Sequence, residues 1–215
     1  MLAAHLALLA LALAAPAAAP PPGPRTAPAV DLVDVAVRIP DAVVDLRYAT
    51  PHNFLGRAVY PPDARCLLRA PVADRLARAA DRLRARGFRL LLWDCFRPLA
   101  VQREMWRRTP RPGYVADPAR GSNHNRGAAV DLALVAADGS AVALPTPFDT
   151  FGPRAHARAE GLPEPARRHR DLLREALTAE GFRVNRMEWW HFDAPEGRGA
   201  PVLEGGFTAA PGTVR

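Results

Sequence analysis

The chain has 215 residues, of which 49% are hydrophobic and 24% charged, enough apolar side chains for one domain with a buried core. Its formal net charge of +7 comes from arginine alone, because the sequence contains no lysine. The arginines alternate with apolar positions in segments of helical spacing such as residues 75–86, which is typical of a solvated helix face. No zinc-finger spacing, basic tail or aromatic-studded basic strand is present, so the composition argues against a nucleic-acid-binding protein.

The amino-terminal segment has the pattern of an export signal. Residues 6–15 form an unbroken apolar run with the length of a signal-peptide core, too short to span a bilayer. We therefore expect a signal peptide at residues 1–17, a Pro/Ala-rich leader at residues 18–30 and one folded domain over residues 31–215. The protein is expected to be exported, periplasmic or secreted, without stable membrane insertion. Because His5 is the only basic side chain before the run, an uncleaved tail is the alternative.

The elements predicted after the leader mix short strands with helices. In chain order they are strands at residues 33–40 and 43–48, a helix at 71–86, a strand at 88–93, a helix at 98–108, a hairpin at 128–144, a helix at 165–180 and a final strand at 182–193. Pro71 suits the first turn of its helix and Gly87 its end, and Asp138-Gly139 marks the hairpin turn. Without a βαβ order, these elements predict an α+β fold with a mainly antiparallel sheet and helices packed around it.

The sequence has two cysteines, Cys66 and Cys95. Two cysteines alone cannot build a thiolate metal site. In an oxidising compartment an even pair favours a disulfide, and two buried free thiols are the alternative.

The first candidate site lies in residues 122–131. Val130, Leu132 and Leu134 share one face of the predicted strand, and Asp131 points to the other. Burying a carboxylate unpaired in mid-strand is costly, so Asp131 indicates room for an ion or a ligand. His124 lies in the glycine-containing approach to this strand and can fold towards Asp131.

The second candidate segment, Glu188 to Phe192, adds a carboxylate and an imidazole on either side of Trp189 and Trp190. Two histidines and an aspartate are good zinc ligands that leave a fourth position for water, and a glutamate outside the ligand set can take the proton of that water. We expect the tryptophans to wall the site off from bulk water. Because Glu188 and His191 are three residues apart, a regular strand would point them to opposite faces, so a bulge or strand end must intervene, a short helix being the alternative.

The third segment follows the predicted strand at residues 88–93. Arg97 leaves the sheet beside Pro98, where its guanidinium could stabilise a tetrahedral oxyanion and Asp94 could hold it in place. A turn with a solvated charge is the alternative. Each segment is weak alone, but a His-x6-Asp motif with a distant Glu-x-x-His motif is a much more specific pattern.

With these motifs the sequence resembles the zinc-dependent D-alanyl-D-alanine dipeptidases, the group that includes the vancomycin-resistance dipeptidases. The resemblance runs from about residue 31 to about residue 193. The matching motifs are Ser-x-His-x6-Asp at Ser122, His124 and Asp131, Glu-x-x-His at Glu188 and His191, Trp-Asp-x-x-Arg-Pro from Trp93 to Pro98, Tyr-Ala-Thr-x-x-Asn-Phe from Tyr48 to Phe54, and Phe-Asp at Phe148 and Asp149.

The resemblance implies that residues 31–215 are a zinc peptidase domain with one zinc ion per chain, bound on the sheet. It assigns the site as follows: metal ligands His124, Asp131 and His191, general base and acid Glu188, transition-state stabiliser Arg97, and substrate-binding residues Asp149, Tyr48 and Ser122. In that assignment Asp149 and Tyr48 hold the free ammonium group of a small D-amino-acid dipeptide, and Ser122 lines the pocket.

The first hypothesis is therefore hydrolysis of D-alanyl-D-alanine to two D-alanines in cell-wall dipeptide turnover. The alternatives are a zinc D,D-carboxypeptidase that trims peptidoglycan peptides and a non-catalytic wall-binding module that keeps the metal site. Glu188 and Arg97 argue against the module, since binding alone needs neither. The stretch between Arg97 and His124 is shorter than in the resistance enzymes, and the physiological substrate and oligomeric state stay open.

Overall fold

The computed structural model describes residues 32–207, so the predicted signal peptide and leader lie outside the described residues. In the main sheet the strand order is β2-β4-β5-β7-β6, where the strands are β2 Val43–Val44, β4 Phe88–Asp94, β5 Ala129–Ala136, β6 Arg183–Asn185 and β7 Glu188–Asp193. β2 and β4 pair in parallel, and the other neighbours pair antiparallel. A second sheet pairs β1, Leu32–Asp34, with β3, Leu67–Arg69. The predicted α+β class with a mainly antiparallel sheet is confirmed.

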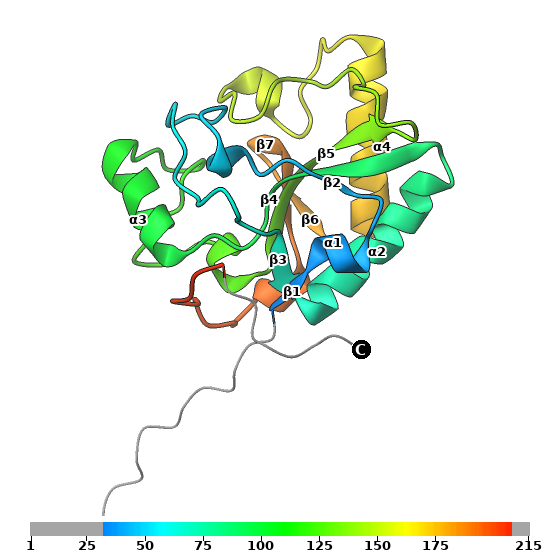
Figure 1. Ribbon diagram of the computed structural model, residues 1–215. Coiled ribbons are helices and arrows are strands. Elements are labelled where there is room, and N and C mark those ends of the chain that lie inside the picture. Colours follow the sequence, from blue (N-terminus) through cyan, green and yellow to red (C-terminus); the bar gives the residue numbers. More distant parts are fainter. Residues whose placement is uncertain (1–31, 208–215) are drawn as a thin grey trace, which may run out of the picture.

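Two long helices cover one face of the main sheet, and a shorter one lies apart from them (Figure 1). α2, Ala70–Arg84, and α4, Glu164–Ala179, pack on each other and against β4 and β5. α2 buries apolar side chains at helical spacing, with Pro71 in its first turn and Gly87 at φ +82° just after its end. α3, Leu99–Arg108, lies beside loops on the side of the molecule opposite to α2 and α4 (Figure 1). All three helices match their predictions to within two residues.

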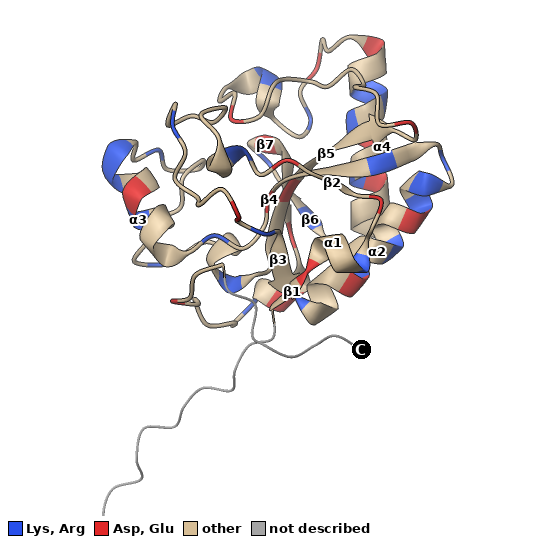
Figure 2. Cartoon of the chain, in the orientation of Figure 1, with Lys and Arg blue, Asp and Glu red and all other residues tan. Residues whose placement is uncertain are grey.

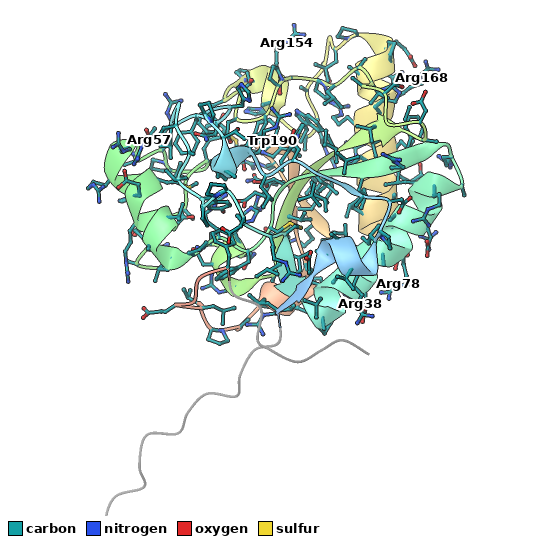
Figure 3. All side chains as sticks on the ribbon, in the orientation of Figure 1. Arg38, Arg57, Arg78, Arg154, Arg168 and Trp190 are labelled. Carbon is teal, nitrogen blue, oxygen red and sulfur yellow. A yellow bond between two sulfur atoms is a disulfide. The ribbon has the colours of Figure 1, made fainter. Side chains whose placement is uncertain are left out.

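Most of the charged side chains lie on the outside of this arrangement and most of the aromatic packing on the inside, with a buried group of charged residues that includes Asp94, Arg97 and Asp131. Arginine and acidic residues follow the helices and outer loops (Figure 2), and the labelled arginines in Figure 3 point outwards while Trp190 lies within the molecule. Trp190 is 1% exposed and packs against Phe148 and Trp189. Among the described residues, no helix is long and apolar enough to cross a membrane.

The two strands predicted at residues 33–40 and 43–48 are largely wrong. β1 ends at Asp34, whose side chain accepts a hydrogen bond from the amide of Ala36 and so begins the short helix α1, Val35–Arg38. β2 is limited to two residues, and a 3-10 turn η1, Arg47–Ala49, follows. The strand predicted at residues 33–40 therefore ends early, because Asp34 caps a helix within the apolar run.

The predictions for residues 128–144 and 182–193 are correct only in part. β5 and the turn at Gly139 form as expected, but the return segment makes one bridge, between Val135 and Ala141, before Pro145, which cannot donate to a ladder. The final segment is a hairpin of β6 and β7 rather than one strand. Its turn is set by Asn185, whose side chain accepts a hydrogen bond from the amide of Met187.

The predicted disulfide between Cys66 and Cys95 is present. Cys66 directly precedes β3 and Cys95 directly follows β4. The bond therefore fixes the end of β4, where the third candidate segment begins, to the smaller sheet.

Candidate active site

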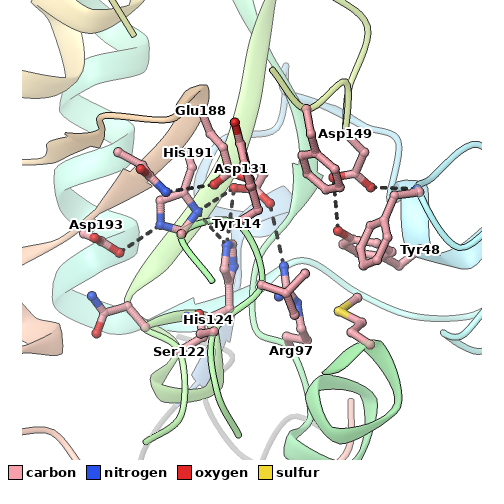
Figure 4. Close-up of a pocket in the computed structure, with 18 of the residues that line it drawn as sticks. Tyr48, Arg97, Tyr114, Ser122, His124, Asp131, Asp149, Glu188, His191 and Asp193 are labelled. Carbon is pink, nitrogen blue, oxygen red and sulfur yellow. Dashed lines mark hydrogen bonds and ion pairs between the residues drawn. The ribbon is translucent and has the colours of Figure 1, made fainter. Parts of the chain in front are cut away.

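Three adjacent strands place the acidic and imidazole side chains in one row. Asp131 on β5 pairs with His191 on β7 and, across its other edge, with Asp94 on β4 after a register shift beyond Leu92. Directly opposed residues on neighbouring strands project to the same face. His124, in the 3-10 turn η2, His124–Arg126, adds its ring to this row from the approach to β5 (Figure 4).

The three predicted metal ligands converge on one point. His191 Nδ1 lies 2.9 Å from Asp131 Oδ1, His124 Nε2 lies 3.3 Å from the same oxygen, and the two ring nitrogens are 3.1 Å apart. One ligand atom from each residue lies within 4.8 Å of the others. His124 and Asp131 are buried and His191 is partly buried. The sequence prediction that these residues meet is therefore correct in geometry.

The hydrogen bond at the second nitrogen of each ring directs a lone pair into this cluster. His124 Nδ1 lies 2.7 Å from the carbonyl oxygen of Cys95, and His191 Nε2 lies 3.0 Å from Asp193 Oδ1, and both partners are acceptors. Each neutral ring thus presents its remaining nitrogen as an acceptor to Asp131. Acceptors that face one another at such distances require a shared cation, so the donor set fits a divalent metal.

The same surroundings attract positive charge in the absence of a metal. Burial alone would lower the pKa of His191, but hydrogen bonds to Asp131 and Asp193 raise it well above the ordinary value for histidine. A proton on His191 and a metal ion at this point are therefore alternatives, and metal binding is expected to release that proton.

Glu188 and His191 both line the cavity, although they are three residues apart. The pairing of β6 with β7 moves from Val184–Phe192 directly to Asn185–Glu188, so the residues between them do not follow a regular ladder. The expected bulge is therefore present. Burial raises the pKa of Glu188 to about 8, with His191 lowering it and the negative charge of Asp131 adding to the rise.

Arg97 is buried and held by several acceptors. Its Nε and Nη2 donate to Asp94 Oδ2 at 3.0 and 2.7 Å, and its Nη1 donates to Gln102 at 2.8 Å. Asp94 also accepts from the hydroxyl of Tyr60. Nη2 of Arg97 lies 3.8 Å from Asp131 Oδ2, so the guanidinium faces the metal-ligand cluster. The prediction that Asp94 fixes Arg97 beside the site is confirmed.

Asp149 lies at the other end of the cavity. Its oxygens accept hydrogen bonds from the hydroxyl of Tyr48 at 3.3 Å and from the amide of Phe54 at 3.1 Å. Its backbone has a φ of +56°, a left-handed conformation that is uncommon outside glycine and aims the side chain into the cavity. Burial raises the pKa of Asp149 to about 7, although the amide of Phe54 lowers it. A carboxylate there is a specific counter-charge for a cationic ligand group.

The cavity that joins these groups has a volume of about 340 Å³. Ser122 lines it, as predicted, and its hydroxyl accepts from the amide of His124. The tryptophans do not wall it, contrary to expectation. Trp189 and Trp190 turn into the core, where Trp189 donates to Thr146, because the irregular part of β7 sends both flanking polar residues to the cavity. The apolar lining comes from other elements: Phe54, Met105, Tyr114, Val115 and Phe151.

Three supporting residues were missed from the sequence. Asp193 orients His191, Asn185 donates to Glu188 Oε2 at 2.8 Å, and Gln102 holds Arg97. Asp193 could have been found, since it lies two residues after His191 on the same strand face. Asn185 was hidden because the turn that brings it back to Glu188 was not predicted.

Comparison with known proteins agrees with the geometry. The sequence profile of the peptidase M15 family, described as D-ala-D-ala dipeptidase, matches residues 28–204. The chain is 38% identical over 185 residues to the D-alanyl-D-alanine dipeptidase of Escherichia coli K12, spanning 85% of this chain and 95% of that protein. The D-alanyl-D-alanine dipeptidase of Enterococcus faecalis is 32% identical over 171 residues, 69% and 83% of the two chains, and that of Streptomyces coelicolor is 34% identical over 178 residues, 71% and 85%.

The cluster of imidazole and carboxylate groups could hold a metal ion, and together with the family match it fits a hydrolase of the metallopeptidase class. Within that class, the chain belongs to the peptidase M15 family of D-Ala-D-Ala dipeptidases. The resemblance inferred from the motifs is thereby confirmed.

Proposed function

We propose that this protein hydrolyses D-alanyl-D-alanine to two molecules of D-alanine in cell-wall dipeptide turnover. The observation that carries the proposal is that one cavity is lined both by the cluster of His124, Asp131 and His191 and by a separate carboxylate, Asp149. A dipeptide has its free ammonium group close to its scissile bond, so an enzyme for it needs both features within one small cavity. The names of the relatives support the same substrate.

We propose zinc, one ion per chain, as the metal. His124, Asp131 and His191 provide two imidazoles and one carboxylate, a set that suits zinc and leaves a position for water. When bound, zinc lowers the pKa of a coordinated water towards about 7 and polarises a carbonyl as a Lewis acid. The identity of the ion is tested by comparing the zinc content of the reconstituted protein with its content of manganese and cobalt.

Side chains of the protein bind the substrate, transfer the proton and stabilise the transition state. Asp149 and Tyr48 hold the substrate ammonium, which places the peptide carbonyl between Arg97 and Glu188. Glu188 takes a proton from the attacking water as a bond forms between the water oxygen and the carbonyl carbon, and Arg97 stabilises the oxyanion. The carbon–nitrogen bond breaks when Glu188 returns the proton to the leaving amine. Ser122 contacts the substrate at the pocket wall.

A substrate panel separates the dipeptidase from the alternatives. We expect purified, zinc-loaded protein to cleave D-Ala-D-Ala well and its amino-acetylated form poorly, because Asp149 would then have no ammonium to hold. A preference for the acetylated form would support a D,D-carboxypeptidase of wall peptides instead. Binding without turnover would support a wall-binding module.

We also propose that the protein is exported to the periplasm or secreted. The Cys66–Cys95 disulfide supports this, because such bonds persist in oxidising compartments, and the apolar run at residues 6–15 has the pattern of a signal peptide. Residues 1–30 fused to alkaline phosphatase, which requires export for activity, should give active phosphatase. A fusion no more active than phosphatase without an export signal would contradict export.

A further inference from the structure

Asn185 makes two hydrogen bonds that link the β6–β7 turn to the proposed catalytic carboxylate. Its Oδ1 accepts from the amide of Met187 at 2.9 Å, and its Nδ2 donates to Glu188 Oε2 at 2.8 Å. Asn185 also lines the cavity. It lies where the pairing of β6 with β7 jumps to Glu188, so the irregular register brings the two side chains together.

The two partners permit a single orientation of the Asn185 amide. A backbone N–H can only donate, so the group facing Met187 must be the carbonyl oxygen. The amide nitrogen then faces Glu188, a carboxylate that accepts. Rotating the amide by half a turn would set oxygen against oxygen at Glu188 and nitrogen against N–H at Met187. The turn thus fixes the direction of the donor.

We propose that Asn185 is a positioning residue for proton transfer by Glu188, an inference that rests on the proposed function. With Oε2 held by Asn185, the carboxylate plane is fixed and the other oxygen, Oε1, is the one that meets the attacking water. Burial opposes an ionised Glu188, and the amide donor offsets part of that cost because a hydrogen bond to the charged form favours it. Asn185 touches neither the substrate nor the metal ligands in this account.

Three variants of Asn185 separate positioning from a role in the turn alone. Asn185→Asp keeps the acceptor for Met187 and the shape of the side chain but replaces the donor by a second acceptor. Asn185→Ser can keep a turn bond to Met187 through its hydroxyl, which is too short to reach Glu188. Asn185→Ala loses both bonds. Asp138→Ala is the matched control, because Asp138 accepts from the amide of Ser140 in a turn that is remote from the site.

We expect Asn185→Asp and Asn185→Ser to lower kcat on D-Ala-D-Ala about 100-fold, as for a catalytic group displaced by about 1 Å, with KM within about twofold. Zinc per chain and Tm should stay near the wild-type values in both. Asp138→Ala should lower Tm with wild-type kcat.

Wild-type kcat in Asn185→Asp, with loss of activity and Tm only in Asn185→Ala, would overturn the proposal and leave a role in the turn. Loss of zinc from Asn185→Asp would overturn it too, since the effect would then act through the metal. If the wild-type protein itself failed to cleave D-Ala-D-Ala when loaded with zinc, the proposed function would fail instead, so the two failures are distinguishable.

Discussion

His191 and Asp131 face each other across β7 and β5, with Nδ1 2.9 Å from Oδ1, although they are 60 residues apart in the chain. The pair depends on the register of two antiparallel strands, in which a slip by one residue would send either side chain to the opposite face. The sheet itself therefore holds two members of the cluster, Asp131 and His191, and His124 joins them from the 3-10 turn before β5.

Glu188→Ala should abolish turnover while zinc remains bound at one ion per chain, because the variant loses the base and keeps the ligands. General base catalysis contributes about 10²–10⁴-fold to rate, so residual activity should fall by at least that order. Steady-state kinetics with metal analysis on the same sample checks this. Loss of zinc from the variant would mean that Glu188 is a ligand.

Asp193→Ala should weaken zinc binding about 10–100-fold, because the outer partner of a metal-bound histidine fixes its ring and tautomer. Asp193 Oδ1 lies 3.0 Å from His191 Nε2, and although burial opposes it, the hydrogen bond with His191 lowers the pKa of Asp193 to about 2. Asp193→Asn keeps an acceptor and should retain most of the affinity. Competition with a chelator measures the three affinities, and equal values for Ala and wild type would contradict the role.

Binding of D-Ala-D-Ala should weaken as the pH falls below about 7, the pKa to which burial raises Asp149. Below that pH the free enzyme holds the neutral carboxyl, so substrate binding must first ionise it. Above it the carboxylate is ready, until the substrate amine, whose pKa is about 8, loses its own charge. The negative charge of Asp131 contributes to the raised pKa of Asp149, and a metal at Asp131 offsets that charge. The pH below which binding weakens is therefore expected to be lower in the metal-loaded protein.

Asp149→Asn is the matched variant for this pH dependence, because asparagine tolerates the left-handed φ of +56° at this position. The Asp149→Asn variant should raise KM for the free dipeptide and remove most of the rise of KM at acidic pH. It should have little effect on KM for the amino-acetylated substrate. If KM of Asp149→Asn still rose at acidic pH as in the wild type, a group other than Asp149 would cause the pH dependence.

Replacing both cysteines, Cys66→Ser with Cys95→Ser, should lower both stability and zinc affinity. The bond closes a loop of 29 residues in sequence separation, for which chain entropy suggests a loss of about 3–4 kcal/mol. The carbonyl of Cys95 also accepts the hydrogen bond from His124 Nδ1, so a freer β4 end should loosen that ligand. Urea unfolding and zinc titration measure the two effects. Wild-type zinc affinity in the folded variant would limit the disulfide to global stability.

The long helices and the cluster of His124, Asp131 and His191 could be predicted from the sequence for physical reasons that are local. In α2, Pro71, a regular apolar stripe and Gly87 agree, so tertiary context had nothing to override. The ligand motifs carry polar residues that a core would otherwise exclude, which made Asp131 visible. The disulfide followed from the pairing of two cysteines in an expected oxidising compartment.

What the sequence could not predict depends on side chains that bond to backbone or on register. The cap at Asp34 ended a strand that its apolar neighbours favoured, and the turn at Asn185 split the last one. The inward turn of Trp189 and Trp190 follows from the irregular pairing of β7, which no periodicity reveals. Gln102 lies in the first turn of α3, five residues after Arg97, but no motif marks it as the partner of that arginine.

The most direct test is a crystal structure of the purified, zinc-loaded protein with anomalous data collected on both sides of the zinc absorption edge. We predict one anomalous peak per chain, coordinated by His124 Nε2, Asp131 Oδ1 and His191 Nδ1, with the Glu188 carboxylate near it and outside the ligand set. A peak at another set of side chains, or full activity in crystals and solution after zinc is removed, would contradict the account.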